Sequence, residues 1–400
     1  MAAPIAARDV SHRVARRPLL LCFSHLRWDF VYQRPQHLMT LAASDYEIWF
    51  IEEPVFETAG EPRLERRAVA DHITAIVPVL VAAERALRIP RVQRKLLDRL
   101  LRAERRHPDV LWYYTPMALE FTNHLSADLC VYDNMDELSA FRHAPARLLE
   151  LEQALFARCD LVFCGGRSLY EAKRRRHPYV HAFPSSIDRA HFAQARSSPA
   201  DPPDQRQIAH PRLGYFGVID ERMDLDLVAE LAQSRPSWQF ILLGPTAKID
   251  AASLPRRPNL HWLGQRSYEA LPSYLAHWDI GIMPFALNDA TRYISPTKTP
   301  EFLAAGVPVV SAPIRDVVLP YGERGLVEIA HDSADWIACI ESLLVRPHRS
   351  WLADADAFLA DMSWRATWRS MHALMIGAAR RRATRFAVPP PLIEPAIGSA

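Results

Sequence analysis

The stretch Ser295-Pro-Thr-Lys-Thr-Pro-Glu301-Phe-Leu-Ala-Ala-Gly306-Val-Pro-Val-Val-Ser311 is the most informative guide to the fold. It predicts a loop, a short helix, a tight turn and a buried strand in succession. Ser295 is a favourable helix N-cap, and Pro296 suits the first helical position. Gly306 ends the helix, and the apolar run after it re-enters a sheet. A helix that leads directly into a buried strand is typical of α/β proteins.

The same stretch carries chemistry as well as structure. Lys298 and Glu301 are three residues apart and share a face near the start of the helix. A helix N-terminus attracts anions, so a lysine beside it suits a diphosphate. A carboxylate one turn further on suits the diol of a ribose. The alternative is an ordinary capped helix that precedes a strand.

The composition indicates a globular protein of two domains. The chain has 400 residues, of which 49% are hydrophobic and 24% charged. The net charge of +2 gives no case for a nucleic-acid partner. The five cysteines are odd in number and lie mostly in apolar runs, which favours reduced core residues in a cytoplasmic protein. No apolar stretch is long enough to span a bilayer.

Two series of apolar runs, separated by helical patterns, predict two doubly wound parallel sheets of the α/β class. The strands of the first series are expected at 19–23, 46–51, 72–80 (an edge strand), 110–114, 129–132 and 161–164. Those of the second are expected at 213–217, 238–243, 260–263, 280–283 and 307–311. The predicted limits are a disordered basic start (1–17), a first domain (18–195), a linker (196–212), a second domain (213–360), a return helix (361–385) and a disordered tail (386–400).

Several runs resemble GT-B glycosyltransferases, near family 4 and the teichuronic-acid type (group 1). They are the opening stretch above, Phe183–Asp188 with Phe192, Gly214–Gly217 with Asp220 and Arg222, His261–Gly264 with Tyr268, and Ser363-Trp364 with Trp368 and Met371. The resemblance implies two Rossmann-like domains that face across a cleft, with a C-terminal helix that crosses back to the first domain. It also implies a nucleotide-sugar co-substrate, no further cofactor, and retention of the anomeric configuration.

The resemblance assigns the donor to the second domain. The donor-binding candidates are Gly217, Arg222, Gly244, Ser295, Pro296, Thr297, Lys298 and Glu301. Arg222 and Lys298 are expected to stabilise the departing diphosphate, whose charge grows in the transition state. The sequence departs from the family at Tyr293, where the family has the first glutamate of a Glu-x7-Glu pair.

An acidic cluster follows the fifth predicted strand, at the sheet edge where doubly wound folds place ligands. Asp133 and Asp136 are candidates for catalysis, either on the acceptor side or at the sugar hydroxyls. The alternative is that Asp133 or Asn134 caps a helix. Asp224 and Asp226 are expected to be acids of a first helical turn, so the sequence predicts no metal site.

The loop after the first strand is polar and aromatic, which suits a sugar acceptor. Its candidates for contact with the acceptor or the donor phosphate are Arg27, Trp28, Asp29, Gln33 and Arg34. Aromatic rings stack on sugar faces, whereas arginine and aspartate bind hydroxyl groups or charge.

A basic amphipathic helix is expected from Arg91 to Arg106. Its basic residues include Arg91, Lys95, Arg99 and Arg102, and leucines occupy the other side. It suits the anionic inner face of a cell membrane, where it would bring the enzyme to a lipid-linked acceptor. The alternative is a solvated helix face packed by its leucines.

The sequence therefore predicts a metal-independent, retaining glycosyltransferase. It would move a sugar from a nucleoside diphosphate to a cell-surface polysaccharide or a lipid-linked glycan. The alternatives are a nucleotide-sugar epimerase of the same fold and a degenerate, non-catalytic glycan-binding partner. An epimerase would release a sugar isomer without an acceptor.

Overall fold

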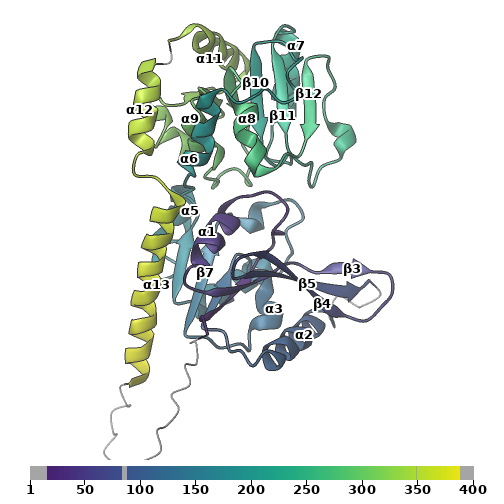
Figure 1. The fold of residues 1–400 in the computed structure, drawn as a ribbon, viewed down its shortest axis with the longest axis vertical. Coiled ribbons are helices and arrows are strands. Elements are labelled where there is room, and N and C mark those ends of the chain that lie inside the picture. The colour runs from purple at the N-terminus through teal and green to yellow at the C-terminus, as the bar shows by residue number, and fades with distance from the viewer. Residues whose placement is uncertain (1–15, 83–87, 348, 388–400) are drawn as a thin grey trace, which may run out of the picture.

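The chain folds into two α/β domains that lie one above the other (Figure 1). The computed structural model describes residues 16–82, 88–347 and 349–387. Residues 1–15 and 388–400, which make up most of the predicted start and tail, lie outside the described residues. The predicted fold class is confirmed, because each domain is built on a sheet of mainly parallel strands with helices on both faces.

The sheet of the first domain has the order β3-β5-β2-β1-β6-β7-β8-β9, and β4 pairs antiparallel with β5. Side chains on its two faces form separate apolar clusters. This explains why the central strands read as unbroken apolar runs. The strands are β1 (Leu19–Phe23), β2 (Glu47–Ile51), β3 (Val55–Glu57), β4 (Arg63–Ala70), β5 (Ile73–Val81), β6 (Val110–Tyr113), β7 (Leu129–Asn134), β8 (Leu161–Cys164) and β9 (Val180–Ala182).

One expectation about this sheet is wrong. The run at 72–80 was expected to form an edge strand, but β5 has neighbours on both sides. The antiparallel β4 pairs along one side of β5, and β2 and β3 pair with successive parts of its other side. These additional strands form the arm that projects from the first domain in Figure 1. Residues of β4 are mostly exposed and charged, which is a common way to protect a sheet edge from further pairing.

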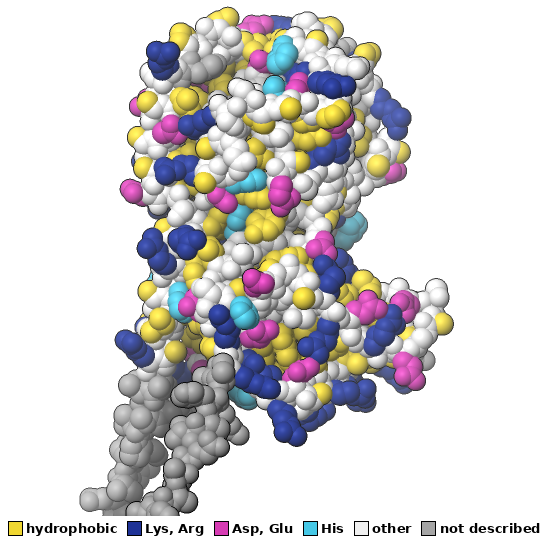
Figure 2. Space-filling model, in the orientation of Figure 1, with side chains coloured by type: hydrophobic (Ala, Val, Ile, Leu, Met, Phe, Trp, Pro, Cys, Tyr) yellow, Lys and Arg dark blue, Asp and Glu magenta, His cyan; other side chains and the backbone are white. Residues whose placement is uncertain are grey.

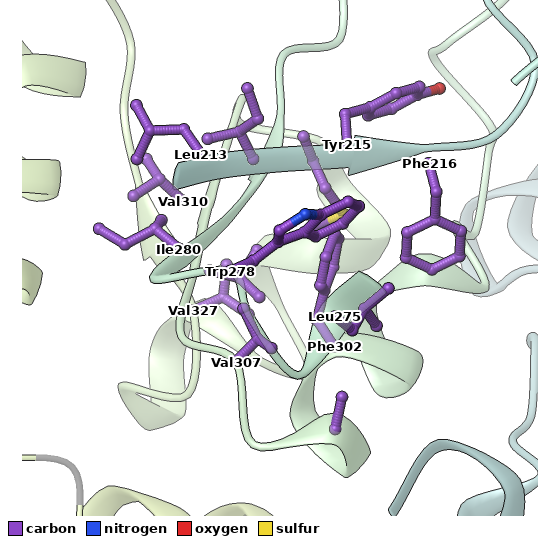
Figure 3. Close-up of a cluster of buried hydrophobic side chains, with 14 of the residues drawn as sticks. Leu213, Tyr215, Phe216, Leu275, Trp278, Ile280, Phe302, Val307, Val310 and Val327 are labelled. Atoms are coloured by element: carbon purple, nitrogen blue, oxygen red, sulfur yellow. The ribbon is translucent and has the colours of Figure 1, made fainter. Parts of the chain in front are cut away.

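The second sheet is fully parallel, in the order β12-β11-β10-β13-β14-β15. Trp278 lies at the centre of its core, against the backbone of β10 (Figure 3). A Cβ atom on Gly214 would lie 2.0 Å from the indole ring, so the glycine makes room for Trp278. The strands are β10 (Arg212–Phe216), β11 (Gln239–Leu243), β12 (Leu260–Gly264), β13 (Ile280–Met283), β14 (Val309–Ser311) and β15 (Glu328–Ile329).

The α-helices cover both faces of the two sheets. In the first domain they are α1 (Arg34–Ala42), α2 (Ile89–Ala103), α3 (Leu119–Thr122), α4 (Leu148–Arg158) and α5 (Arg167–Lys173). The later ones are α6 (Arg189–Phe192), α7 (Leu225–Ser234), α8 (Leu271–Leu275), α9 (Lys298–Ala305), α10 (Arg315–Val318), α11 (Ser333–Val345), α12 (Arg349–Leu359) and α13 (Trp364–Ala387). None of the described helices is both long enough and apolar enough to cross a membrane.

The last helix, α13, crosses back to the first domain, as predicted, and runs along its side in Figure 1. Trp364, Trp368 and Met371 pack into the first domain's core beside α1. The Trp368 indole also donates a hydrogen bond to Asp45, at 3.3 Å. The second domain is thus tied to the first at two points, through the connection after β9 and through α13.

The connection between the domains is well packed. Ile187 and Phe192, which precede the predicted linker, already belong to the second domain's core. Within the linker, Gln205 is fully buried and accepts a hydrogen bond from the Trp278 indole at 3.0 Å. Arg212 is buried as well and pairs with Asp201 at 2.8 Å.

Candidate functional site

The largest cavity described lies between the two domains, where the C-terminal ends of both sheets face each other. Its volume is about 750 Å³. The first domain contributes the loop after β1, and the second contributes the loops after β10, β11 and β12 and the start of α9. The lining residues are Trp28–Gln33, Phe216–Val218, Arg222, Leu243–Pro245, Gln265–Glu269, Leu271, Thr297, Lys298 and Glu301. Doubly wound sheets bind ligands at this edge.

Two glycines at strand ends shape the floor of this cavity. Gly217 and Gly244 follow β10 and β11 with φ angles of +133° and +146°, a region that other residues rarely adopt. A Cβ atom on Gly244 would lie 1.8 Å from the carbonyl oxygen of Gly217, and one on Gly217 would lie 2.3 Å from Cε of Lys298. The glycines therefore leave the backbone bare and let Lys298 lie directly against it.

Lys298 and Glu301 stand on the first turn of α9 and face the cavity. Neither charge has a hydrogen-bonded or ion-paired partner among the described residues; the Lys298 ammonium lies 5.3 Å from the centre of the Tyr215 ring. Burial lowers the pKa of Lys298 to about 8, with the positive charge of Arg222 acting in the same direction. Burial raises the pKa of Glu301 to about 7, although Lys298 opposes this shift. Two uncompensated charges in a cavity wall are suited to a ligand that supplies the missing partners.

The helix begins two residues later than predicted. Its N-cap is Thr297, without a side-chain cap, and Lys298 is the first helical residue. Ser295 instead holds the two domains together, since its carbonyl accepts a hydrogen bond from the Ser185 hydroxyl at 2.6 Å. Ser295 and Pro296 line a smaller cavity of about 90 Å³, which shares Gln33, Arg222, Thr297 and Lys298 with the large one.

Arg222 reaches both cavities from the loop after β10. Its guanidinium is held by Asp220, with nitrogen–oxygen distances of 2.7–3.1 Å. The side chain is still 25% exposed, so further donors remain available to a ligand. Asp136 of the first domain lines the smaller cavity, and burial raises its pKa while Arg222 lowers it.

The structure places Asp133 away from both cavities. Asp133 is fully buried and forms three hydrogen bonds of 2.8–3.1 Å with the guanidinium of Arg34. Arg34 also donates to the carbonyl of Phe183 at 2.7 Å. The helix-capping alternative is wrong, because the Asn134 amide donates to Tyr132 and to the carbonyl of Asp136 instead. Asp136 is therefore the acid of this cluster that lines a cavity, and Arg34, which pairs with Asp133, lines the same smaller cavity.

The loop after β1 divides into an anchored part and a lining part. Arg27 turns away from the cavity to Glu52, at 3.0 Å, and the same carboxylate accepts a hydrogen bond from the backbone N–H of Trp28. Trp28, Asp29 and Gln33 line the cavity. Asp29 also forms an ion pair with Arg67. The sequence did not predict Glu52 as the anchor, because Arg27 follows β1 whereas Glu52 follows β2.

Other contributors come from the second domain and cross to the first. Gln265 donates a side-chain hydrogen bond to the carbonyl of Phe30. The ring of Tyr268 lies 4.7 Å from that of Tyr32, between the two domains. Tyr268 belongs to one of the runs that resemble the family, but the sequence of that run does not indicate that its side chain lies between the domains.

Tyr293 and the Asp224–Asp226 pair do not reach the large cavity. Tyr293 packs against an apolar cluster of the first domain, so the family's glutamate position faces away here. Asp224 is the N-cap of α7 and accepts a hydrogen bond from Leu227, while Asp226 lies in the first turn, as expected. Within the described ranges, no three His, Cys, Asp or Glu side chains are grouped closely enough to hold a metal ion.

Residues 210–346 match the family described as glycosyl transferases group 1. A protein named as a teichuronic acid biosynthesis glycosyltransferase, TuaH of Bacillus subtilis (strain 168), is 29% identical over 222 residues. That alignment covers 50% of this chain and 54% of the relative, so the chain spans about half the length of the curated relative it matches. These findings confirm the resemblance to group 1 transferases.

Solved structures share the two-domain fold. Sucrose-phosphate synthase from Thermosynechococcus elongatus aligns with a TM-score of 0.70 at 14% identity, over 93% of this chain and 100% of that one. A trehalose-phosphate synthase from Burkholderia xenovorans aligns with a TM-score of 0.67 at 12% identity, over 90% and 100% of the two chains. At these identities the similarity shows the GT-B fold alone.

Proposed function

We propose that this chain, with its group 1 match over residues 210–346, transfers a sugar from a nucleoside diphosphate donor to a glycan. The observation that carries the proposal is the pair of uncompensated charges on Lys298 and Glu301, in a cavity between the two sheets. A nucleotide sugar supplies the complement of both, a diphosphate for the ammonium and a ribose diol for the carboxylate.

The reaction breaks the bond between the anomeric carbon and the diphosphate oxygen, and negative charge grows on the diphosphate as it leaves. Lys298, Arg222 and the backbone N–H groups at the start of α9 are placed to stabilise that charge. Such contacts accelerate the reaction because they strengthen toward the transition state. These cations supply the stabilisation without a metal ion, so metal independence is part of the proposal.

The new bond forms between the same carbon and an acceptor hydroxyl, whose proton passes to the departing diphosphate. Asp136 is the first-domain acid that lines the smaller cavity, so it is the candidate to bind the sugar or the acceptor hydroxyl there. Trp28, Asp29 and Gln33 would contact the acceptor from the first domain, residues 18–195, which the proposal assigns to the acceptor side. Retention of configuration remains an inference from the family.

The acceptor is proposed to be a cell-surface polysaccharide or a lipid-linked glycan, by analogy with the teichuronic acid relative. The helix α2 would bring the enzyme to an anionic inner membrane face. Its leucines Leu96, Leu97 and Leu101 are buried, which leaves the basic residues on the outside. Figure 2 shows Lys and Arg side chains along the lower edge of the first domain, where Figure 1 places α2.

The decisive experiment combines binding and transfer. Calorimetry with uridine, guanosine, thymidine and adenosine diphosphates, followed by transfer assays with the matching sugars, should identify one preferred donor. Glu301→Ala should weaken its binding by about 1.5–3 kcal/mol. Product released as a sugar isomer without acceptor would indicate an epimerase, and glycan binding without any nucleotide affinity would indicate the non-catalytic partner.

A further inference from the structure

One residue that lines the large cavity carries a buried hydroxyl without a partner. Six buried side-chain polar atoms of the described residues lack any hydrogen bond: His25 Nδ1, Trp112 Nε1, Tyr114 Oη, Asn134 Oδ1, Glu221 Oε2 and Tyr268 Oη. Of the residues that carry them, Tyr268 alone lines the large cavity. Since buried polar groups are nearly always hydrogen-bonded, an unpaired one in a cavity wall indicates a missing ligand.

The Tyr268 ring is held in a fixed position. It stacks on the His191 ring, with centroids 4.2 Å apart and planes inclined by 11°. Tyr32 of the first domain lies 4.7 Å away on a tilted plane, and Phe192 meets the ring edge-on at 5.6 Å. The His191 ring also hydrogen-bonds the Tyr268 carbonyl, at 3.0 Å. The hydroxyl is therefore positioned before any ligand arrives, which lowers the entropic cost of binding.

The hydroxyl and the Glu301 carboxylate belong to the same wall. Both residues line the cavity. Burial raises the pKa of Tyr268, and the negative charge of Glu301 raises it further, so the two groups lie within electrostatic reach of each other. Tyr268 thus remains a protonated hydrogen-bond donor at every physiological pH. Glu301, when ionised, is an acceptor only.

We propose that Tyr268 is a further donor-binding residue, and that its hydroxyl and the Glu301 carboxylate together bind the ribose diol of the nucleotide. A ribose hydroxyl accepts a hydrogen bond with its lone pairs and donates one with its proton. A donor and an acceptor that line the same cavity can satisfy both capacities. This inference rests on the proposed function, and it adds that the site recognises the ribose of the nucleotide.

The consequence is selection for an intact ribose. A site built to hydrogen-bond a hydroxyl discriminates strongly against the analogue that lacks it, because its own buried polar groups are then left unpaired. Loss of either the Tyr268 hydroxyl or the Glu301 carboxylate should therefore weaken the preference for ribonucleotides over deoxynucleotides, whichever base the cavity prefers.

The test compares each ribonucleoside diphosphate with its 2′-deoxy and 3′-deoxy analogues on the same base. In calorimetry on the full chain, at least one deoxy analogue should bind the wild type about tenfold more weakly or worse. Tyr268→Phe keeps the ring and removes only the hydroxyl, so it should reduce the ratio of ribo to deoxy affinity at least threefold. The control is Tyr321→Phe, a buried tyrosine of the second domain that does not line this cavity and should leave the factor unchanged.

Two results would overturn the inference. One is equal binding of the ribo and both deoxy nucleotides to the wild type, within twofold. The other is a Tyr268→Phe protein, folded by circular dichroism, that discriminates as well as the wild type. If no nucleoside diphosphate binds at all, the proposed function fails instead, so the two failures are distinguishable.

Discussion

Glu301→Gln should stabilise the unliganded protein in a pH-dependent way while it weakens nucleotide binding. The substitution keeps the size of the side chain and removes the charge that burial disfavours. The pKa of Glu301 in the folded protein, about 7, lies above the ordinary value of 4.5 for a glutamate. Such a group favours the folded state fully below the unfolded pKa, and that contribution is lost as the pH rises through the folded pKa.

The magnitude follows from these two values. At 1.36 kcal/mol per pKa unit, the ionised carboxylate costs the folded state about 3 kcal/mol at pH 8. This figure already includes the attraction of Lys298, which opposes the effect of burial on the pKa of Glu301. The variant should therefore be about 1–3 kcal/mol more stable than the wild type at pH 8. The difference should shrink as the pH falls below 7 and approach zero only below the unfolded pKa of 4.5.

The assay is urea unfolding, followed by tryptophan fluorescence, at pH 5.5 and pH 8 without ligand. Glu269→Gln is the matched control, since Glu269 lines the same cavity but is exposed. It should change stability little at either pH. An equal effect of Glu301→Gln at both pH values, or a loss of stability at pH 8, would refute the reasoning that Glu301 is an uncompensated buried charge.

Three further outcomes are expected. Gly217→Ala should lower stability by about 1–3 kcal/mol and abolish transfer, because φ is +133° and the new Cβ would displace Lys298; thermal unfolding and transfer assays check it. Lys298→Ala should lower turnover more than it weakens binding of the bare nucleoside, and the wild type should stay active in a chelator; equal losses would contradict the first expectation. Changing Arg91, Lys95, Arg99 and Arg102 of α2 to Gln should reduce pelleting with anionic liposomes at low salt but leave transfer to a short soluble acceptor unchanged. Equal pelleting would make α2 an ordinary packed surface helix.

The buried strands were the easiest elements to predict. β1, β8 and β13 lie where their apolar runs placed them, because strands covered on both faces read as continuous hydrophobic segments. The charged β4 was missed, since only two of its eight residues are even half-buried and no apolar alternation marks it. The short β9 and β15 were missed as well, because two or three residues carry too little pattern.

The candidate site divides in the same way. Lys298 and Glu301 were found because a local motif places both on one helical turn. The partner of Asp133 was not, because Arg34 is 99 residues away and nothing local signals the pairing. The unpaired hydroxyl of Tyr268 depends on how His191 and Tyr32 pack around its ring, which sequence spacing does not encode.

The contrast between paired and unpaired buried charges indicates where the ligand binds. Several other buried ions of the described residues are paired: Asp133 with Arg34, Glu152 with Lys173 at 2.8 Å, and Arg212 with Asp201. A buried charge without a partner is costly, so selection for stability alone would remove it. Lys298 and Glu301 keep that cost at the junction of the two domains, where both sheets end. A ligand with an anionic group at one end and hydroxyl groups further along would supply the missing partners on binding. The same two side chains would then lower the stability of the free protein and raise its affinity for a nucleotide.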